Sequence, residues 1–566
     1  MIQDRLRILF LIRDDGNMTE PMGVMLLSAI AKQHRAYCDT FIAVLSHDDV
    51  VERVKTLRPH IVVSSMITGS HQDYLEANRA IKKKFPDVVT IAGGPHATFN
   101  PQIIHTEPLD ALCAGEGDYA WNEFIDAFEA GRPYDDIKNI VTQSNASRVL
   151  AQVKSHGSDM PSWRAINLSR PLTGKELDAL PYMDRALVYD NTPFGHRTKR
   201  TMMTSRGCPF ICTYCFEGDF YRMYRKSVGS LVVFQRMSVE RVIAELEEMV
   251  GRYHTTFIKF YDDIFTAHKG PDQWIADFAD QYPRRVGLPF HFLTRTDLLD
   301  EWPLKKFIVA GLDRGSMTMS IEAGNAWIRE NVMERKMSEE DIRLAFTLCE
   351  ENKVRTFTNI IFGVPVPKDV MKEHGMRPID YDIQSVKMCM DMHVSWVECP
   401  VLFPYGGTPM YGYLVERGFF SGNLDELGLS YQGESPLTCF THEEKMQQLR
   451  LSLLGPVVTL FSGSHSRIMQ LFAKPVFYLA TKVFIYVPMN KAYLLLFNAV
   501  RNWIHLTRIY PPGKKLGIVG TLQFIKDNLI LDWAKRFKNQ KRVVRSGELT
   551  LGGLLPAPAK EKVYTK

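Results

Sequence analysis

Three closely spaced cysteines constrain this chain more than any other feature of its sequence. Cys208, Cys212 and Cys215 stand in C-x3-C-x2-C spacing within the segment MMTSRGCPFICTYCFEGDFY (202–221), directly after Gly207. Thiolates are the usual ligands of iron–sulfur clusters, and a four-iron cluster held by three cysteines keeps one iron open for another ligand. Zinc sites usually take four ligands from two separated pairs, and no second pair stands at a matching distance here. The spacing therefore predicts a 4Fe-4S cluster in preference to zinc or to three structural cysteines.

The segment resembles the cluster loop of radical S-adenosylmethionine (SAM) enzymes, in which an aromatic residue precedes the last cysteine, as Tyr214 does here. The resemblance implies that the cluster binds SAM at its open iron and cleaves it to a 5'-deoxyadenosyl radical. SAM is therefore the second cofactor that we expect, and an external electron donor of the flavodoxin or ferredoxin type would reduce the cluster.

Length and composition indicate a multidomain globular chain. Its 566 residues suffice for roughly two to four domains. A net charge of +5 is small for this length and gives no reason to expect a nucleic-acid partner. Nine cysteines without regular pairing indicate a reducing compartment. The N-terminal MIQDRLRILFLIRDD lacks a small-residue cleavage site and is typical of a first strand, so we expect a cytoplasmic protein.

Residues 1–135 alternate strand and helix signals. Five apolar runs predict strands, at 8–12, 40–45, 61–66, 88–94 and 111–115. The alternation is typical of an α/β domain with a doubly wound parallel sheet of the flavodoxin or Rossmann type, whose ligands bind outside the carboxyl ends of the strands. Glycine at such an end allows close backbone approach to a ligand. The candidate residues at these ends are Ser64, Ser65, Thr68, Gly93, Gly94, His96, Gly115, Glu116 and Gly117.

The segments EPMGVMLLSAIAK (20–32), IAGGPHATFNP (91–101) and AGEGDYAWNEF (114–124) resemble the cobalamin-binding domain that precedes many radical SAM domains. The resemblance implies cobalamin as a third cofactor, held by the candidate residues just named. Many cobalamin domains use a D-x-H-x-x-G motif whose histidine binds the cobalt, but the first loop here, RDDGNMTEPMG, has no histidine. We therefore expect that no protein imidazole holds the lower face of the cobalamin, and His96 is the nearest alternative.

Residues 136–198 form a connector rich in Pro, Ser and Asn, with a hairpin expected near 139–153. Strand and helix signals then resume across 199–410. Six strands are predicted, at 200–205, 256–265, 290–296, 316–324, 356–365 and 396–404. Six units are too few for a complete eight-stranded barrel, so we expect a partial (β/α)6 TIM-like barrel with its site at the carboxyl ends of the strands.

Polar side chains stand at the ends of these strands, where a buried strand would otherwise be apolar. They are Asp262, Asp263, Arg295, Ser320, Glu322, Asn359 and Glu398. The phrases FYDDIF, SIEAGN with RENVMERKM, IIFGVP and LFPYGGTPMY resemble, in this order, segments of cobalamin-dependent radical SAM enzymes. The resemblance implies that the strand ends hold SAM, with Asp262 and Asp263 near its methionine amino group. Ser320, Glu322 and Arg295 would lie near its ribose and carboxylate.

The last part of the chain loses the alternation. Residues 411–545 predict a mainly helical domain, and residues 546–566 a disordered tail. The apolar stretches contain Lys474, Lys482 and Lys491, so no uncharged run reaches the roughly 18 residues of a spanning helix. Two alternatives are open for this region: a helical cap over the barrel mouth, or a face for a membrane surface or a lipid substrate. The basic run AKRFKNQKRVVR would suit an anionic lipid surface.

These features favour a cobalamin-dependent radical SAM enzyme that methylates an unactivated carbon of a hydrophobic small molecule, such as a lipid, an isoprenoid or a tetrapyrrole. The 5'-deoxyadenosyl radical would remove a hydrogen from the substrate, and methylcobalamin would supply the methyl group. An oxidative cyclase or rearrangement enzyme, similar to the anaerobic magnesium-protoporphyrin ester cyclase, is the alternative within the same family. A cobalamin and iron–sulfur sensor without turnover is the alternative of another class.

Overall fold

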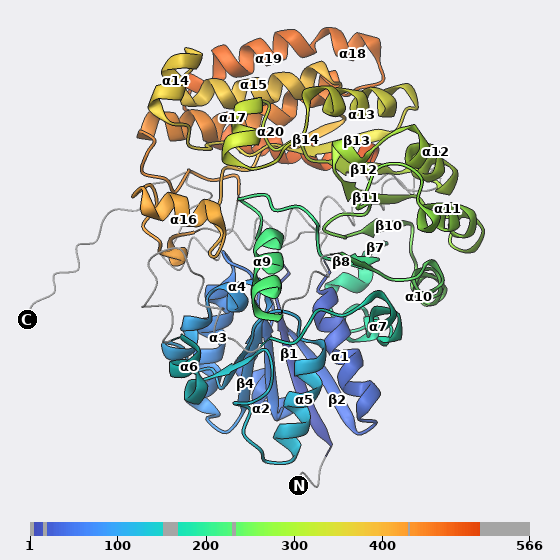
Figure 1. Cartoon of the computed structure of the whole chain (residues 1–566), viewed down its shortest axis with the longest axis vertical. Helices are drawn as coiled ribbons and strands as arrows, with labels where there is room; N and C mark the ends of the chain where they lie inside the picture. Colours follow the sequence, from blue (N-terminus) through green and yellow to red (C-terminus); the bar gives the residue numbers. More distant parts are fainter. Residues whose placement is uncertain (1–4, 15–19, 151–167, 229–233, 428–430, 510–566) are drawn as a thin grey trace, which may run out of the picture.

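The computed structural model of the chain describes residues 5–14, 20–150, 168–228, 234–427 and 431–509. The expected disordered tail and the basic run AKRFKNQKRVVR lie outside these residues. Two sheets follow one another along the long axis of the molecule, and helix α9 (Phe216–Val228) stands between them (Figure 1).

The N-terminal sheet has six strands in the order β2-β1-β3-β4-β5-β6. Its parallel strands are β1 (Leu6–Ile12), β2 (Cys38–Val44), β3 (Ile61–Ser65), β4 (Val89–Gly93) and β5 (Ala111–Cys113). The helices that cover its two faces are α1 (Met22–His34), α2 (Val50–Leu57), α3 (His71–Lys84), α4 (Gly94–Phe99) and α5 (Asp118–Glu129). The predicted doubly wound α/β domain is confirmed. Its strand order reverses between β1 and β3, which is where such sheets bind ligands.

The expected hairpin near 139–153 is wrong. A single short strand, β6 (Ile140–Thr142), pairs antiparallel with β5, and helix α6 (Gln143–Leu150) follows it directly. Thr142 and Asn145 explain this turn, because the Thr142 amide donates to the Asn145 side chain at 2.9 Å and the Asn145 amide donates to the Thr142 hydroxyl at 3.2 Å. This reciprocal pair ends the strand and starts the helix in the way that short polar side chains do at helix N-termini.

The second sheet is an open, all-parallel set of six strands in the order β14-β13-β12-β11-β10-β7. They are β7 (Lys199–Met202), β10 (Phe257–Phe260), β11 (Phe290–Thr294), β12 (Ser316–Met319), β13 (Arg355–Asn359) and β14 (Trp396–Glu398). The outer helices are α10 (Val239–Arg252), α11 (Gln273–Arg285), α12 (Glu301–Ala310), α13 (Glu339–Glu351) and α15 (Pro378–Asp391). The predicted partial six-stranded barrel is confirmed, with each strand shorter than its apolar run suggested.

After the barrel, the described residues up to 509 are mainly helical, as predicted. The helices are α16 (Pro409–Glu416), α17 (His442–Ser462), α18 (Arg467–Leu471), α19 (Ala473–Lys482) and α20 (Asn490–Ile504). They do not form one continuous cap over the carboxyl ends of the strands: α16 lies there, with its Met410 amide donating to the Thr213 carbonyl, but α20 does not. Helix α20 and the following turn run along β12–β14 toward their amino ends, where the Ser316 hydroxyl bonds to the Ile509 carbonyl and Arg355 donates to the Thr507 carbonyl at 2.7 Å. Helices α17, α19 and α20 therefore share the apolar core of the barrel, whereas α16 packs in a separate apolar cluster.

Helix α9 joins the cysteine loop to the N-terminal domain. Met223 and Tyr224 are buried in the apolar core on one face of the N-terminal sheet, and the Phe220 ring meets Phe99 of α4 edge-on at 5.2 Å. The Tyr224 hydroxyl accepts the backbone amide of Glu116 at 2.8 Å. Because α9 begins one residue after Cys215, this packing fixes the cysteine loop against the carboxyl edge of the N-terminal sheet.

A buried carboxylate joins the two domains on the other side of the interface. Glu20, which is 3% exposed, accepts the Thr201 amide at 2.9 Å, the Thr201 hydroxyl at 2.6 Å and the Tyr189 hydroxyl at 2.8 Å. The guanidinium groups of Arg185 and Arg200 lie 4.0 and 3.6 Å from it. A buried charge pair of this kind contributes little when complete but is costly to break, because the remaining charges stay buried without a partner.

We predict that Glu20→Ala lowers the free energy of unfolding by about 3–5 kcal/mol, because three donors lose their acceptor and Arg200 loses its carboxylate, while Arg185 is left with Glu245 at 3.4 Å. Chemical denaturation followed by tryptophan fluorescence would measure the loss. Glu20→Gln is the matched control, since the amide oxygen retains an acceptor for Thr201, and it should lose less. Equal stability of Glu20→Ala and wild type would show that this network does not hold the domains together.

Candidate functional site

The cysteine loop lies between β8 (Ser205–Arg206) and α9 and is fixed from several sides. Thr213 donates its amide to the Met333 carbonyl at 3.0 Å and its hydroxyl to the Val332 carbonyl at 2.6 Å. The Thr213 carbonyl accepts the Met410 amide of α16 at 3.0 Å. Gly207 has φ +81°, in the region that favours glycine, and this conformation turns the chain into the loop.

The three predicted cluster ligands lie together in this loop. Cys212 is 5% exposed, and Cys208 and Cys215 are half-buried. Burial raises the pKa of Cys208 to about 12 and the pKa of Cys215 above its ordinary range, and the neighbouring thiols add to both shifts. Loading such a site must therefore release protons, because the ligands bind as thiolates.

Among the described residues, no group of three His, Cys, Asp or Glu side chains is arranged around a single metal ion. Three thiols on one immobilised loop, with no fourth cysteine beside them in the described chain, fit a four-iron cluster with an open iron.

A cationic side chain that the sequence did not single out contacts the loop. Arg335 is 7% exposed and lies 3.6 Å from the Cys212 sulfur, 3.3 Å from the Tyr214 hydroxyl and 2.7 Å from the Ser320 carbonyl. In the sequence, Arg335 was indicated only by its position in the phrase RENVMERKM, which follows the strand that leads to the predicted residues Ser320 and Glu322.

Glu322 lies near Arg335 and Tyr214. Its φ of +68° is unusual for a residue with a side chain and marks backbone strain, of a kind that concentrates at functional sites. Burial raises the pKa of the Glu322 carboxyl, while Arg335, the Tyr214 hydroxyl and Arg295 oppose the shift. The neighbouring Ser320 hydroxyl accepts the Asn359 side-chain amide at 3.0 Å. Ser320, Glu322 and Asn359 therefore meet at one edge, beside the cysteine loop.

Asp262 and Asp263 have different surroundings although they are adjacent. One oxygen of Asp262 accepts the amides and hydroxyls of Thr204 and Ser205, at 2.6–3.0 Å, so this side chain shapes the approach to the cysteine loop. Asp263 is exposed and accepts the Gly207 amide. Surrounding protein and the charge of Asp262 raise the pKa of Asp263 to about 6.

Two other strand-end residues differ in their placement. Arg295 stacks over the Phe210 ring of the cysteine loop, 3.7 Å from its centroid, and forms a bidentate pair with Asp297. Glu398 instead accepts from Arg501 of α20 at 2.7 Å. Glu398 stands opposite Asn359 at the same edge of the sheet, but its carboxylate is already engaged in this ion pair, which the sequence did not show.

At the carboxyl edge of the N-terminal sheet, where cobalamin is expected, contacts within the protein explain why two of the predicted positions are glycine. A Cβ on Gly94, at φ +87°, would lie 2.7 Å from the Met66 carbonyl, and a Cβ on Gly115 would lie 2.5 Å from the Tyr224 hydroxyl. Gly93 and Gly117 precede the first turns of α4 and α5. Two of the predicted serines differ: Ser64 is buried, and Asn78 donates to its hydroxyl at 2.9 Å, whereas Ser65 is exposed.

His96 belongs to a compact polar group. Its ring stacks on His71 at 3.9 Å, its Nδ1 lies 3.0 Å from the Thr68 hydroxyl, and His71 Nε2 lies 3.0 Å from Asp425. Burial lowers the pKa of His96 to about 3, so the imidazole is neutral. With 2% of its surface exposed, His96 has little access to a ligand.

Glu116 connects the predicted cobalamin edge to the cysteine loop. Its carboxylate lies 3.6 Å from Arg206, which also forms a bidentate pair with Asp118 at 2.7 and 3.0 Å. Arg206 stands two residues before Cys208. Burial raises the pKa of Glu116. The carboxyl edge of the N-terminal sheet and the cysteine loop therefore face each other through charged contacts.

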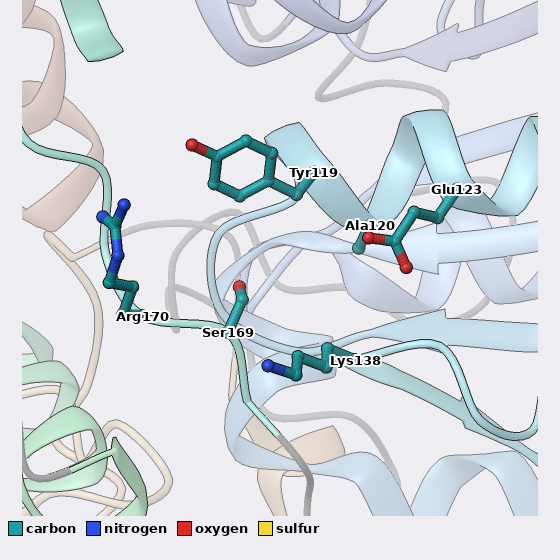
Figure 2. A pocket seen from close by; sticks show the side chains of 6 residues that line it. All are labelled: Tyr119, Ala120, Glu123, Lys138, Ser169 and Arg170. Atoms are coloured by element: carbon teal, nitrogen blue, oxygen red, sulfur yellow. The ribbon is translucent and has the colours of Figure 1, made fainter. Parts of the chain in front are cut away.

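A separate hollow of about 220 Å³ contains none of the predicted site residues. Figure 2 shows the side chains that line it, from α5 and from two neighbouring segments of the connector: Tyr119, Ala120, Glu123, Lys138, Ser169 and Arg170. Tyr119 and Arg170 both bond to Glu176, at 2.8 and 2.6 Å, so these two side chains already have a protein partner.

Comparison with known proteins identifies both domains. Residues 8–125 match the family model of the B12 binding domain, and residues 202–374 match that of the Radical SAM superfamily. An uncharacterized methyltransferase of Pyrococcus horikoshii is 29% identical over 407 residues, which cover 71% of this chain and 79% of the relative. The anaerobic magnesium-protoporphyrin IX monomethyl ester cyclase of Rubrivivax gelatinosus is 26% identical over 335 residues, which cover 58% of this chain and 55% of the cyclase.

A solved structure shares the fold over nearly the whole chain. It is the cobalamin-dependent SAM radical enzyme OxsB with aqua-cobalamin and SAM bound, which aligns with a TM-score of 0.59 at 15% identity, over 96% of this chain and 80% of OxsB. The order of the two domains, and the three cysteines near the start of the second, agree with these matches. The chain therefore belongs to the cobalamin-dependent radical SAM enzymes, whose cofactors are cobalamin, SAM and a 4Fe-4S cluster.

Proposed function

We propose that this chain transfers a methyl group to an unactivated carbon of a hydrophobic substrate. One observation carries the proposal: α9 and the Glu116–Arg206 contact bring the cysteine loop against the carboxyl edge of the B12-binding domain. A methyl donor at that edge and a radical source at that loop would then share one space, as consecutive hydrogen removal and methyl transfer require.

We assign the cluster to Cys208, Cys212 and Cys215, and SAM to the side chains around them. When bound, the cluster supplies the electron that cleaves SAM, and cobalamin supplies the methyl group. Asp263 has a pKa of about 6 and is mostly ionised at pH 7, so it suits the ammonium group of SAM. Asp262 is better suited to positioning, because Thr204 and Ser205 already occupy one of its oxygens.

The remaining candidate residues are proposed for the rest of SAM and for cobalamin. Ser320, Glu322 and Arg295 are proposed for the ribose and carboxylate of SAM. The exposed Ser65 and the backbone around Gly93 and Gly117 are proposed for cobalamin. His96 is buried and hydrogen-bonded to Thr68. This supports the proposal that no protein imidazole binds the lower face of the cobalt.

The substrate class rests on the apolar C-terminal region and on the tetrapyrrole ester named for the cyclase relative. That relative also supports a second candidate, oxidative cyclisation by the same radical. A flavodoxin or ferredoxin remains the proposed electron donor, and the free state of all nine cysteines suits a reducing compartment such as the cytoplasm.

We predict that Cys212→Ala abolishes 5'-deoxyadenosine formation after anaerobic reconstitution with iron, sulfide and cobalamin, reduction and addition of SAM. Mass spectrometry measures the product, and wild type should form it. Cys439→Ala is the matched control, because Cys439 is exposed and lies far along the chain from the loop. A cofactor-loaded wild type that forms no 5'-deoxyadenosine would favour the sensor and contradict an enzyme.

The same assay with methyl-labelled SAM separates the two enzyme candidates. Methylation transfers the label to the substrate and adds one CH2 to its mass. Cyclisation adds neither, so an unlabelled product would replace our proposal with the second candidate.

We predict that Arg335→Gln makes the reduction potential of the cluster more negative, because a cationic donor beside the Cys212 thiolate is lost. Arg335→Lys keeps the charge and should restore part of the potential. Redox titration followed by electron paramagnetic resonance measures both. Unchanged potentials in a cluster-loaded Arg335→Gln protein would limit Arg335 to its contacts with Tyr214 and Ser320.

A further inference from the structure

The outer face of α18 and α19 carries apolar side chains where a helix of a soluble protein normally carries polar ones. Exposed residues recur there at spacings of three and four, on one side of a nearly continuous helix. They are Ile468 (71% exposed), Leu471 (76%), Phe472 (53%), Tyr478 (62%) and Leu479 (42%). We call these five residues the apolar face. Contiguous exposed apolar surface of this kind marks an interaction site.

The opposite side of the same helix is fixed to the protein. Ala473, Ala480 and Ile485 are buried in the barrel core, with Val476 and Phe477 packed beside them. The segment Arg467–Tyr486 is long and apolar enough to cross a membrane, and 22% of it is buried. Its fixed inner side and its charged residues Arg467, Lys474 and Lys482 favour a helix that lies along a surface over one that spans a bilayer.

The stretch of chain that carries the apolar face has charges of one sign, and Asp380 of α15, whose carboxylate interacts with Lys482, is already paired with Arg377 at 2.9 Å. Residues 445–509 contain eight Lys and Arg and no Asp or Glu, whereas the average of the whole chain would place about seven acidic residues in a stretch of this length. On and beside the apolar face, Arg467, Lys474, Lys482 and Lys491 are all exposed. Cations at the border of an apolar helical face complement the negative surface of anionic lipids.

We propose that the apolar face docks this enzyme onto an anionic membrane surface. A second copy of the chain is a poorer occupant, because a symmetric dimer through this face would bring like charges together without a carboxylate from this stretch to balance them. Figure 1 shows α18 and α19 at the end of the molecule opposite the B12-binding domain, so the face points away from that domain. Membrane docking does not depend on the proposed methyl transfer and can be tested without cofactors.

Flotation of the full chain with vesicles tests the proposal. Wild type should bind phosphatidylcholine vesicles containing about one third phosphatidylglycerol, bind pure phosphatidylcholine weakly, and lose binding as salt rises. Leu471→Ser with Leu479→Ser should reduce binding at least about fivefold. The matched control is Val309→Ser with Leu344→Ser, which removes exposed apolar residues from α12 and α13.

A second pair tests the charges without altering the apolar residues. Lys474→Glu with Lys482→Glu should also reduce binding to the anionic vesicles at least about fivefold. Lys83→Glu with Lys84→Glu, on α3 of the other domain, makes the same charge change and should bind like wild type. Equal binding to both vesicle types, full binding by either face variant, or a dimer that the Leu471 and Leu479 changes abolish in light scattering would each overturn the proposal.

Discussion

The packing of α9 into the N-terminal core is the contact on which the candidate site depends. The helix begins directly after the last cysteine of the motif. Met223 and Tyr224 bury it in a domain whose parallel strands end more than a hundred residues earlier in the chain. Without this contact the cysteine loop would be a connection at the edge of the barrel. With it, the loop lies where two sheets present the carboxyl ends of their strands, which is where parallel α/β domains place their ligands.

Charged groups removed from solvent are the second feature that defines this interface. Glu20 with Arg185 and Arg200 lies on one side of it, and Glu116 with Arg206 lies on the cysteine-loop side. Each arrangement combines opposite charges with hydrogen bonds, which is the condition under which ions tolerate burial. Such networks add little net stability, but they define one relative placement of the domains. The proposed methyl transfer, in which cofactors of two different domains act in turn on one substrate carbon, would require that precision.

Local sequence patterns predicted the elements well and the contacts between them poorly. Apolar periodicity located the parallel strands of both sheets, because each strand is buried and its signal is local. It missed that α20 lies along β14 and pairs Arg501 with Glu398, since nothing local to either residue records a partner a hundred positions away. Arg335 was missed for the same reason. Gly94 and Gly115 were correctly noticed as special, but their neighbours in the protein already explain them. The structure places Cys208, Cys212 and Cys215 in one loop, and the short spacing of the motif had predicted that proximity.

The central claim is that the cluster and the cobalamin occupy one shared space between the domains. Electron paramagnetic resonance of the chain loaded with both, with the cluster reduced and the cobalt in its paramagnetic Co(II) state, tests it most directly. The account predicts magnetic interaction between the two centres, seen as broadening or splitting that is absent when either cofactor is omitted. Two independent, unperturbed signals from a fully loaded protein would contradict it, because they would place the cofactors at separate sites.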